Sequence, residues 1–405
     1  MFKTCKINDE IHLHYRRDKG FKTITTAIFI RTPLEDKKAT KTALVAECLR
    51  GGCEKYPSMS AISKELEDMW GGVYEVAVIK RGDEQVIYLC LESIKKDFDK
   101  AMSFLGEIMF KDNMNNTEFI ENGKDRLKET IKSIKDDAVE YAIETMVEKL
   151  AENCDNHFKT PAFGIIENVD EITKKDLKNH WKTMLMESPI EIFVIGDENE
   201  EKVITKTKNL FHKMKRQALT IETKVFSRDK RGEAYVEGRN LNQARLAITF
   251  SFGVKDTKKI VPLLVLNEIL GGGVGSYLYN SIRESYGLCY SINSFVFKQK
   301  MLLVVQSGID KNSFQMAIRG IREEVKKLSI HITKADIETA KKALIKEYNG
   351  YMDTPYDMIN TGFSLLILNK DMNLEKFKDS IKSVKEEEVI ELAKEMKEEI
   401  SYFLQ

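Results

Sequence analysis

The sequence predicts an α+β fold built from two homologous domains, each an antiparallel sheet with helices packed on one side. Three observations lead to this prediction. The chain has 405 residues, which is more than one core usually organises. It contains an internal repeat. Within each copy, strands and helices follow one another in the order expected of a sheet covered by a separate helical layer.

The repeat relates the two halves of the chain without a gap over its first part. Ala27-Ile28 and Gly51-Gly52 recur as Ala247-Ile248 and Gly271-Gly272, each 220 positions further along. A short deletion in the second copy then shifts the register. Because a repeat sets the domain plan before any local interpretation, two domains of about 200 residues follow.

The repeat places the first domain at 1–215 and the second at 231–405. Residues 216–230 between them are polar and basic with no sustained periodicity, which is typical of a linker. Such a charge run is usually solvated connection, and we assign it no binding role.

Strands and helices are expected from periodicity. Strands are predicted at 24–31, 74–80, 85–91, 190–195, 246–252, 292–297, 301–306 and 400–404, and helices at 94–109, 118–134 and 313–328. The two pairs of adjacent strands are separated by short turn-like segments and form hairpins.

The composition excludes several classes of protein. Lys and Arg together number 64, as do Asp and Glu, so no net charge favours nucleic acid or anionic lipid. No apolar run approaches the ~20 residues that span a membrane, and the N-terminus lacks a secretory signal. Six scattered cysteines indicate free thiols. We therefore expect a cytoplasmic protein.

A glycine-rich segment in the second half carries the most specific signal. Gly271, Gly272 and Gly273 free the backbone to turn tightly at a helix end. Arg283 follows on the last turn of the next helix, and Tyr290 stands where a strand begins. An arginine offers a fixed fork of donors and a tyrosine one directional O–H. Taken singly, they would be a surface residue and a core aromatic. A phosphate loop is disfavoured, since G-x-x-x-x-G-K-[ST] is absent.

This segment resembles the C-terminal-domain signature of the insulinase/mitochondrial-processing-peptidase family. The resemblance covers nearly the whole chain and implies that Arg283 and Tyr290 bind the backbone of an extended peptide and help to stabilise the tetrahedral intermediate. The sequence departs from the family at Cys289, where Ala is common, and at Tyr277 and Tyr286, where Arg or a similar residue is common. Cleavage specificity therefore does not carry over.

The other half of the family's active site is missing. Counting back from Gly51-Gly52, the positions of the family's His-x-x-Glu-His zinc helix fall on Thr42, Val45 and Ala46. A catalytic zinc needs about three ligands and a base for its water. The sequence therefore predicts no metal and no cofactor in this chain. Glu129 stands near the family's third ligand, but a lone Glu on a charged helix is usually solvated.

The histidines and cysteines of the chain offer little support for an alternative metal site or a cysteine nucleophile. The six histidines are His12, His14, His157, His180, His212 and His331. His12 and His14 would share one face of a strand, where a two-His metal site is conceivable, although ordinary surface histidines are expected. Cys289 has no histidine close in sequence to activate it.

The resemblance is greatest to zinc-free family members that pair with a zinc-bearing sister. It implies a non-catalytic subunit that binds extended peptides and supplies Arg283 and Tyr290, while zinc resides in a partner with His-x-x-Glu-His. Alternatives are a structural or peptide-binding homodimer with a vestigial site, and a self-sufficient peptidase with an unusual metal site. Zinc content and the partner with which the chain associates distinguish them.

Overall fold

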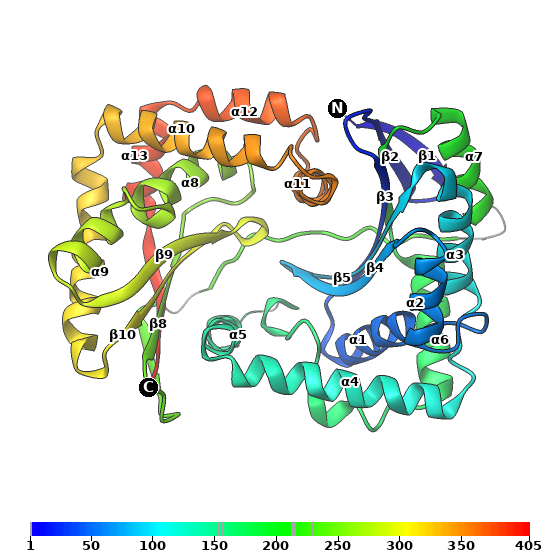
Figure 1. Cartoon of the computed structure of the whole chain (residues 1–405). Helices are drawn as coiled ribbons and strands as arrows, with labels where there is room; N and C mark the ends of the chain where they lie inside the picture. The colour runs from blue at the N-terminus through cyan, green and yellow to red at the C-terminus, as the bar shows by residue number, and fades with distance from the viewer. Residues whose placement is uncertain (1, 153, 155–156, 212–215, 229–230) are drawn as a thin grey trace. The chain divides into compact units, whose positions relative to one another are not determined.

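The computed structural model describes residues 2–152, 154, 157–211, 216–228 and 231–405 (Figure 1). These residues divide into two compact units. The first comprises Met1–Ser133, Thr160–Glu222 and Asp353–Ser364, and the second comprises Ile134–Lys159, Thr223–Met352 and Leu365–Gln405. Each unit therefore contains a segment from the other half of the sequence.

The first unit contains a six-stranded sheet in the order β1-β2-β6-β3-β5-β4. Its strands are β1 (Lys3–Asn8), β2 (Ile11–Arg17), β3 (Thr23–Pro33), β4 (Val73–Arg81), β5 (Glu84–Ile94) and β6 (Ile190–Gly196). β2 and β6 run parallel, and the other neighbouring strands run antiparallel. The predicted hairpin of β4 and β5 is confirmed.

Most helices of the first unit cover one face of this sheet (Figure 1). They are α1 (Asp36–Gly51), α2 (Met59–Glu67), α3 (Phe98–Phe110), α4 (Thr117–Asp136), α6 (Lys174–Glu187) and α7 (Glu200–Phe211), with short turns η1 (Lys95–Asp97) and η3 (Ile166–Asn168). Side chains of β3 alternate between the faces: Ile28 and Ile30 point into the core under these helices. Ala27 and Phe29 face the opposite side and are also fully buried.

A helix from the second half of the sequence covers that opposite face. α11 (Pro355–Ile367) places Phe363 on Phe29, with ring centroids 3.9 Å apart in a stacked arrangement. Tyr356 of α11 meets Tyr88 of β5 edge-on at 6.2 Å. Phe363 is 1% exposed. The sheet of the first unit is therefore buried on both faces.

The second unit contains a five-stranded sheet in the order β7-β11-β8-β10-β9. Its strands are β7 (Glu233–Glu237), β8 (Ala244–Ser251), β9 (Cys289–Phe297), β10 (Leu302–Ile309) and β11 (Lys397–Leu404). β7 and β11 run parallel, and the other pairs run antiparallel. β9 lies at one edge.

Helices pack on both faces of this second sheet. One face is covered by α8 (Ile260–Asn267), α9 (Phe314–His331), α10 (Lys334–Gly350), α12 (Leu374–Lys382) and α13 (Glu386–Glu395), with helical segments η4 (Glu268–Gly272) and η5 (Tyr279–Ser285) and turns η6 (Lys298–Lys300) and η7 (Lys311–Ser313). The other is covered by α5 (Ala138–Ala151), which comes from the first half of the sequence and is followed by η2 (His157–Lys159). Met146 of α5 packs in one buried cluster with Ala247 and Val304.

The predicted fold class is confirmed, with two differences. Each sheet contains one parallel pair, and each carries a helix on its second face. The predicted boundaries 1–215 and 231–405 follow the repeat, whereas the compact units exchange α5 and α11 because each sheet has apolar side chains on both faces. Of the predicted linker and its margins, 212–215 and 229–230 lie outside the described residues. None of the described helices is long and apolar enough to cross a membrane.

Because α11 covers the sheet of the first unit, one of its side chains should contribute strongly to the free energy of unfolding. Phe363→Ala should lower the free energy of unfolding by about 3–5 kcal/mol, because it removes the ring stacked on Phe29 and leaves a cavity. Urea unfolding followed by circular dichroism measures this change. The exposed Met59→Ala is the control and should stay within about 0.5 kcal/mol of wild type. Equal stability of Phe363→Ala and wild type would contradict the role of α11.

Candidate functional site

The glycine run lies at the end of α8, pressed against strand β9. A side chain at Gly271 would place its Cβ 2.6 Å from the Ser294 Oγ and 2.8 Å from the Ser294 N. A side chain at Gly272 would collide with the carboxylate of Glu268. Glycine is therefore required where the turn approaches the strand most closely. The close approach fixes the turn relative to the strand that carries Tyr290.

Arg283 and Tyr290 are brought together on the surface of the second unit. The Arg283 guanidinium carbon lies 4.6 Å from the ring centroid of Tyr279 and 5.8 Å from that of Tyr290. Tyr290 is 80% exposed, as the second residue of edge strand β9. Such cation–π contact orients the guanidinium without using its N–H donors. Two donors for a ligand thus lie side by side.

The segment between these two residues explains their geometry. Ile282 is fully buried, so it anchors the helical turn that exposes Arg283. Gly287 adopts φ 62°, and the N–H of Leu288 donates to the Ile282 carbonyl at 3.0 Å. A left-handed residue here redirects the chain from helix to strand within three residues. The predicted positions of Arg283 at a helix end and Tyr290 at a strand start agree with this structure.

The residues that depart from the family pattern have distinct environments. The Tyr277 hydroxyl donates to Asp336 Oδ2 at 2.9 Å, and burial raises the pKa of Tyr277 to about 12. Tyr277 is therefore held against the start of α10. Tyr286 is exposed. Burial raises the pKa of the Cys289 thiol, which disfavours the thiolate that a nucleophile needs.

The positions of the family's zinc helix lie within the core of the first unit. Thr42, Val45 and Ala46 of α1 are each 0% exposed. The Thr42 Oγ1 shares a hydrogen bond of 2.8 Å with Nε2 of His180 on α6, and burial lowers the pKa of His180 to about 4. Sequence reasoning missed this neutral imidazole, because nothing in the local pattern indicates that α6 crosses α1 at Thr42.

Glu129 does not lie in the core with the predicted zinc-helix positions. It is exposed on α4, whereas Gly123 and Leu127 of the same helix are buried against the core. Within the described part of the chain, no group of three or more His, Cys, Asp or Glu side chains is arranged to hold a metal ion.

His12 and His14 share one face of β2, as the strand period predicts, and both contact Glu191. The Glu191 Oε2 lies 2.8 Å from the His14 Nε2 and 3.5 Å from the His12 Nδ1. Arg31 Nη1 lies 3.7 Å from the other carboxylate oxygen. The expectation of a surface histidine is wrong for His14, which is 2% exposed. The cluster is a buried charge network within the first unit. His212 lies outside the described residues.

Comparison with known proteins identifies the family. A family model described as "Peptidase M16 inactive domain" matches residues 171–344. Over this segment the chain is similar to the insulinase-like peptidase family. The resemblance inferred from the glycine, arginine and tyrosine residues is thereby confirmed.

Relatives of this chain include proteins described as inactive. It is 22% identical to the "Probable inactive metalloprotease YmfF" of Bacillus subtilis (strain 168), over 96% of this chain and 95% of the relative. It is 22% identical to the "Non-peptidase homolog YmxG" of Helicobacter pylori, over 71% of this chain and 66% of the relative. Similarity extends to a probable β subunit of the mitochondrial-processing peptidase of Arabidopsis thaliana, 25% identical over 73% of this chain and 57% of the relative.

Solved structures share the fold of this chain. A conserved protein from Enterococcus faecalis V583 superposes with a TM-score of 0.88 at 23% identity, covering 100% of this chain and 98% of that one. A peptidase M16 inactive domain from Pseudomonas fluorescens gives a TM-score of 0.84 at 14% identity, covering 100% and 97%. These likenesses establish the fold.

The histidine–glutamate network predicts a pH-dependent stability. The hydrogen bond with Glu191 holds the pKa of His12 above 6.5, so this stabilisation is complete below about pH 6.5 and is lost as pH rises through the folded pKa. Burial alone would raise the pKa of Glu191, but the hydrogen bonds from His12 and His14 hold this pKa below 4.5. The stabilisation that ionised Glu191 provides is therefore present above about pH 4.5 and is lost as the pH falls through the folded pKa.

Glu191→Gln should therefore lower the free energy of unfolding by roughly 3 kcal/mol at about pH 6 and by less at about pH 8. Urea titrations at the two pH values measure the difference. Asp170→Asn, which breaks an exposed pair with Lys128, is the control and should cost at most about 1 kcal/mol. A loss that is the same at both pH values would exclude His12 as the titrating partner.

Proposed function

We propose that this chain is the non-catalytic, substrate-binding subunit of a two-chain zinc peptidase. The observation that carries the proposal is the pair of half-buried Arg283 and exposed Tyr290, in a chain whose predicted zinc-helix positions are packed as core. The inactive and non-peptidase descriptions of two relatives support a non-catalytic role. The partner would be a homologue that carries His-x-x-Glu-His.

The chemistry of the pair fits an extended peptide as ligand. A peptide presents carbonyl oxygens at regular intervals, and hydrolysis develops negative charge on one of them. The Arg283 guanidinium offers several N–H donors and a permanent charge, and the Tyr290 hydroxyl offers one directional donor. The partner's zinc would supply the activated water. This chain would bind the peptide and orient it.

The placement of Tyr290 supports this role. β9 is the edge strand of its sheet, so its outer backbone groups have no strand partner among the described residues. Tyr286, between Arg283 and Tyr290 in the sequence, is also exposed. Exposed aromatic and apolar side chains beside polar donors are typical of binding surfaces.

A mixing experiment tests the proposal. Combined with a zinc-bearing relative from the same organism, the wild-type chain should promote cleavage of an unstructured peptide, and neither chain alone should cleave it. Arg283→Ala and Tyr290→Phe should each lower kcat/KM by about 100-fold, as expected for loss of one donor to developing charge. Pull-down of the two chains measures assembly separately.

Two exposed residues outside the pair provide controls. Arg319→Ala removes an exposed arginine of α9, and Tyr356→Phe removes one hydroxyl while leaving the ring in place. Both should retain wild-type rates. Wild-type rates in Arg283→Ala and Tyr290→Phe would exclude a role of the pair. A stable homodimer that binds peptide and never associates with the zinc-bearing relative would favour the structural alternative, and stoichiometric zinc in the purified chain would favour a self-sufficient peptidase.

A further inference from the structure

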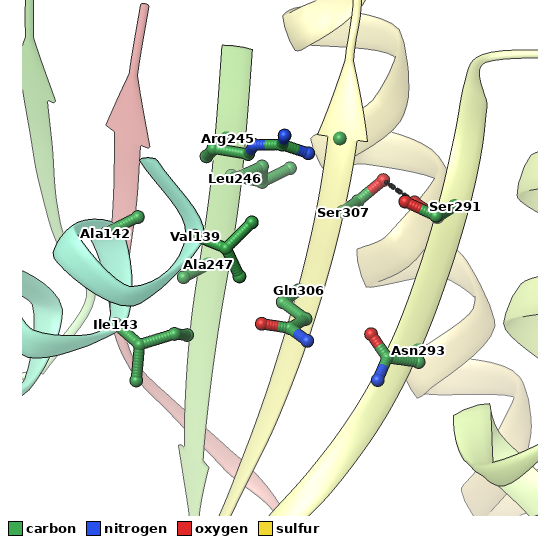
Figure 2. A pocket seen from close by; sticks show the side chains of 11 residues that line it. Val139, Ala142, Ile143, Arg245, Leu246, Ala247, Ser291, Asn293, Gln306 and Ser307 are labelled. Atoms are coloured by element: carbon green, nitrogen blue, oxygen red, sulfur yellow. Dashed lines mark hydrogen bonds between the residues drawn. The ribbon is translucent and has the colours of Figure 1, made fainter. Parts of the chain in front are cut away.

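A cavity of about 60 Å³ lies within the second unit, between α5 and the sheet face that α5 covers (Figure 2). One water needs roughly 10–15 Å³, so the cavity can hold a group of several atoms. Val139, Ala142 and Ile143 of α5 form its apolar wall. The opposite wall is polar and comes from three neighbouring strands.

The polar wall is built by residues paired across the strands. Arg245 of β8 lies opposite Gly308 of β10, which in turn lies opposite Ser291 of β9. In the next row on the same face, Gln306 lies opposite Asn293. Figure 2 shows the side chains of Gln306 and Asn293 side by side, with Arg245 reaching from β8 across the sheet towards the strand that carries Ser307.

Gly308 makes room for the arginine. A Cβ at this position would lie 2.5 Å from the Arg245 Nη1 and 2.8 Å from the Gln243 Oε1. Glycine inside a strand often marks a close approach of another group, and here that group is the guanidinium. The guanidinium therefore lies over Gly308 at the wall of the cavity.

The donors of this wall are largely unused. Arg245 Nη1 donates to the Gln243 Oε1 at 3.1 Å, but the buried Nε has no hydrogen-bond partner. Among the hydrogen bonds of the described residues, none involves the side chain of Gln306 or Asn293. A buried N–H without a partner is costly, and a ligand that accepts from it recovers that cost.

No carboxylate of the described chain neutralises Arg245. Asp137 is the acidic group whose charge acts on it, yet this residue caps α5 by accepting from the N–H groups of Val139 and Glu140. None of the ion pairs between described residues includes Arg245. An arginine keeps its charge at any physiological pH. The cavity therefore combines a free cation, carboxamide groups and an apolar wall.

We propose that this cavity is a carboxylate-binding subsite for peptides, with Arg245 as the charged group and Gln306 and Asn293 as further donors. A planar guanidinium matches the two oxygens of a carboxylate. Ser291 lines the cavity and directly follows Tyr290 along β9, so the subsite shares this edge strand with the surface assigned above and deepens the proposed function, on which it rests. The carboxylate comes either from an acidic side chain or from the C-terminus of the peptide.

Fluorescence anisotropy of the full chain with three labelled peptides tests the subsite. The first contains one Glu and ends in an amide, the second replaces that Glu by Gln, and the third is the Gln peptide with a free C-terminus. At least one peptide with a carboxylate should bind about tenfold more tightly than the neutral peptide. The first and third peptides distinguish the two sources.

Two variants should abolish the preference for peptides that carry a carboxylate, each for a different reason. Arg245→Gln removes the charge, and Gly308→Ala places a methyl group where the guanidinium lies. Gly308→Ala should fold, because the atoms it displaces are the ends of flexible side chains and Ala suits a strand better than Gly. Arg319→Gln, an exposed arginine of α9, is the matched control and should keep the preference.

The outcomes separate this inference from the proposed function. Equal binding of all three peptides, lost in Arg283→Ala, would overturn the subsite and leave the pair of Arg283 and Tyr290 intact. If no peptide binds, titration with N-acetylglutamate amide is followed on the methyl resonances of Ala142, Ile143 and Ala247. Shifts that vanish in Arg245→Gln would support the subsite alone, and unchanged resonances would exclude it.

Discussion

Burial of both faces of each sheet is the constraint on which the rest of the structure depends. In β3, Ile28 points under the main helical layer while Phe29 points to α11. In β8, Ile248 and Ala247 divide in the same way between the main helices and α5. An apolar sheet face without a cover would be a large exposed patch. Each unit therefore needs a helix from the other repeat, and neither repeat completes its core alone.

This constraint explains how far the sequence predicts the fold. The hairpins, the terminal strands and the long helices follow from local periodicity, which depends only on neighbouring residues. The continuous apolar run from Ala27 to Ile30 also signals a strand buried on both sides. Which helix covers the second side depends on the contact of Phe29 with Phe363. No spacing rule connects such distant positions, so the exchange of α5 and α11 was not predictable.

The residues of the candidate sites also differ in whether the local sequence is enough to place them. Arg283 and Tyr290 lie within one short helix–strand segment, so a local motif was enough to place them. Arg245 and Gly308 meet only through strand pairing, and Thr42 meets His180 only through helix packing. For the contact of Arg245 with Gly308, the sequence held one signal, a glycine within a strand pattern. For the contact of Thr42 with His180 it held none, because the apolar face of a helix does not indicate which helix packs against it.

The environment of α1 shows what it would cost to introduce a metal site into the first unit. A zinc site would need imidazoles at Thr42 and Ala46 and a carboxylate at Val45, three positions now closed within the core. A larger ring at Ala46 would overpack its surroundings, and a carboxylate at Val45 would be buried without a partner unless the metal were already present. His180 is held neutral, the form that binds metals, but it is already hydrogen-bonded to the Thr42 hydroxyl. Each single change towards a metal site would therefore destabilise the core before any ion could bind. The surface of the second unit carries no such cost, because Arg283 and Tyr290 lie outside the core, while the buried side chains of Ile282 and Ile292 anchor the elements that carry them.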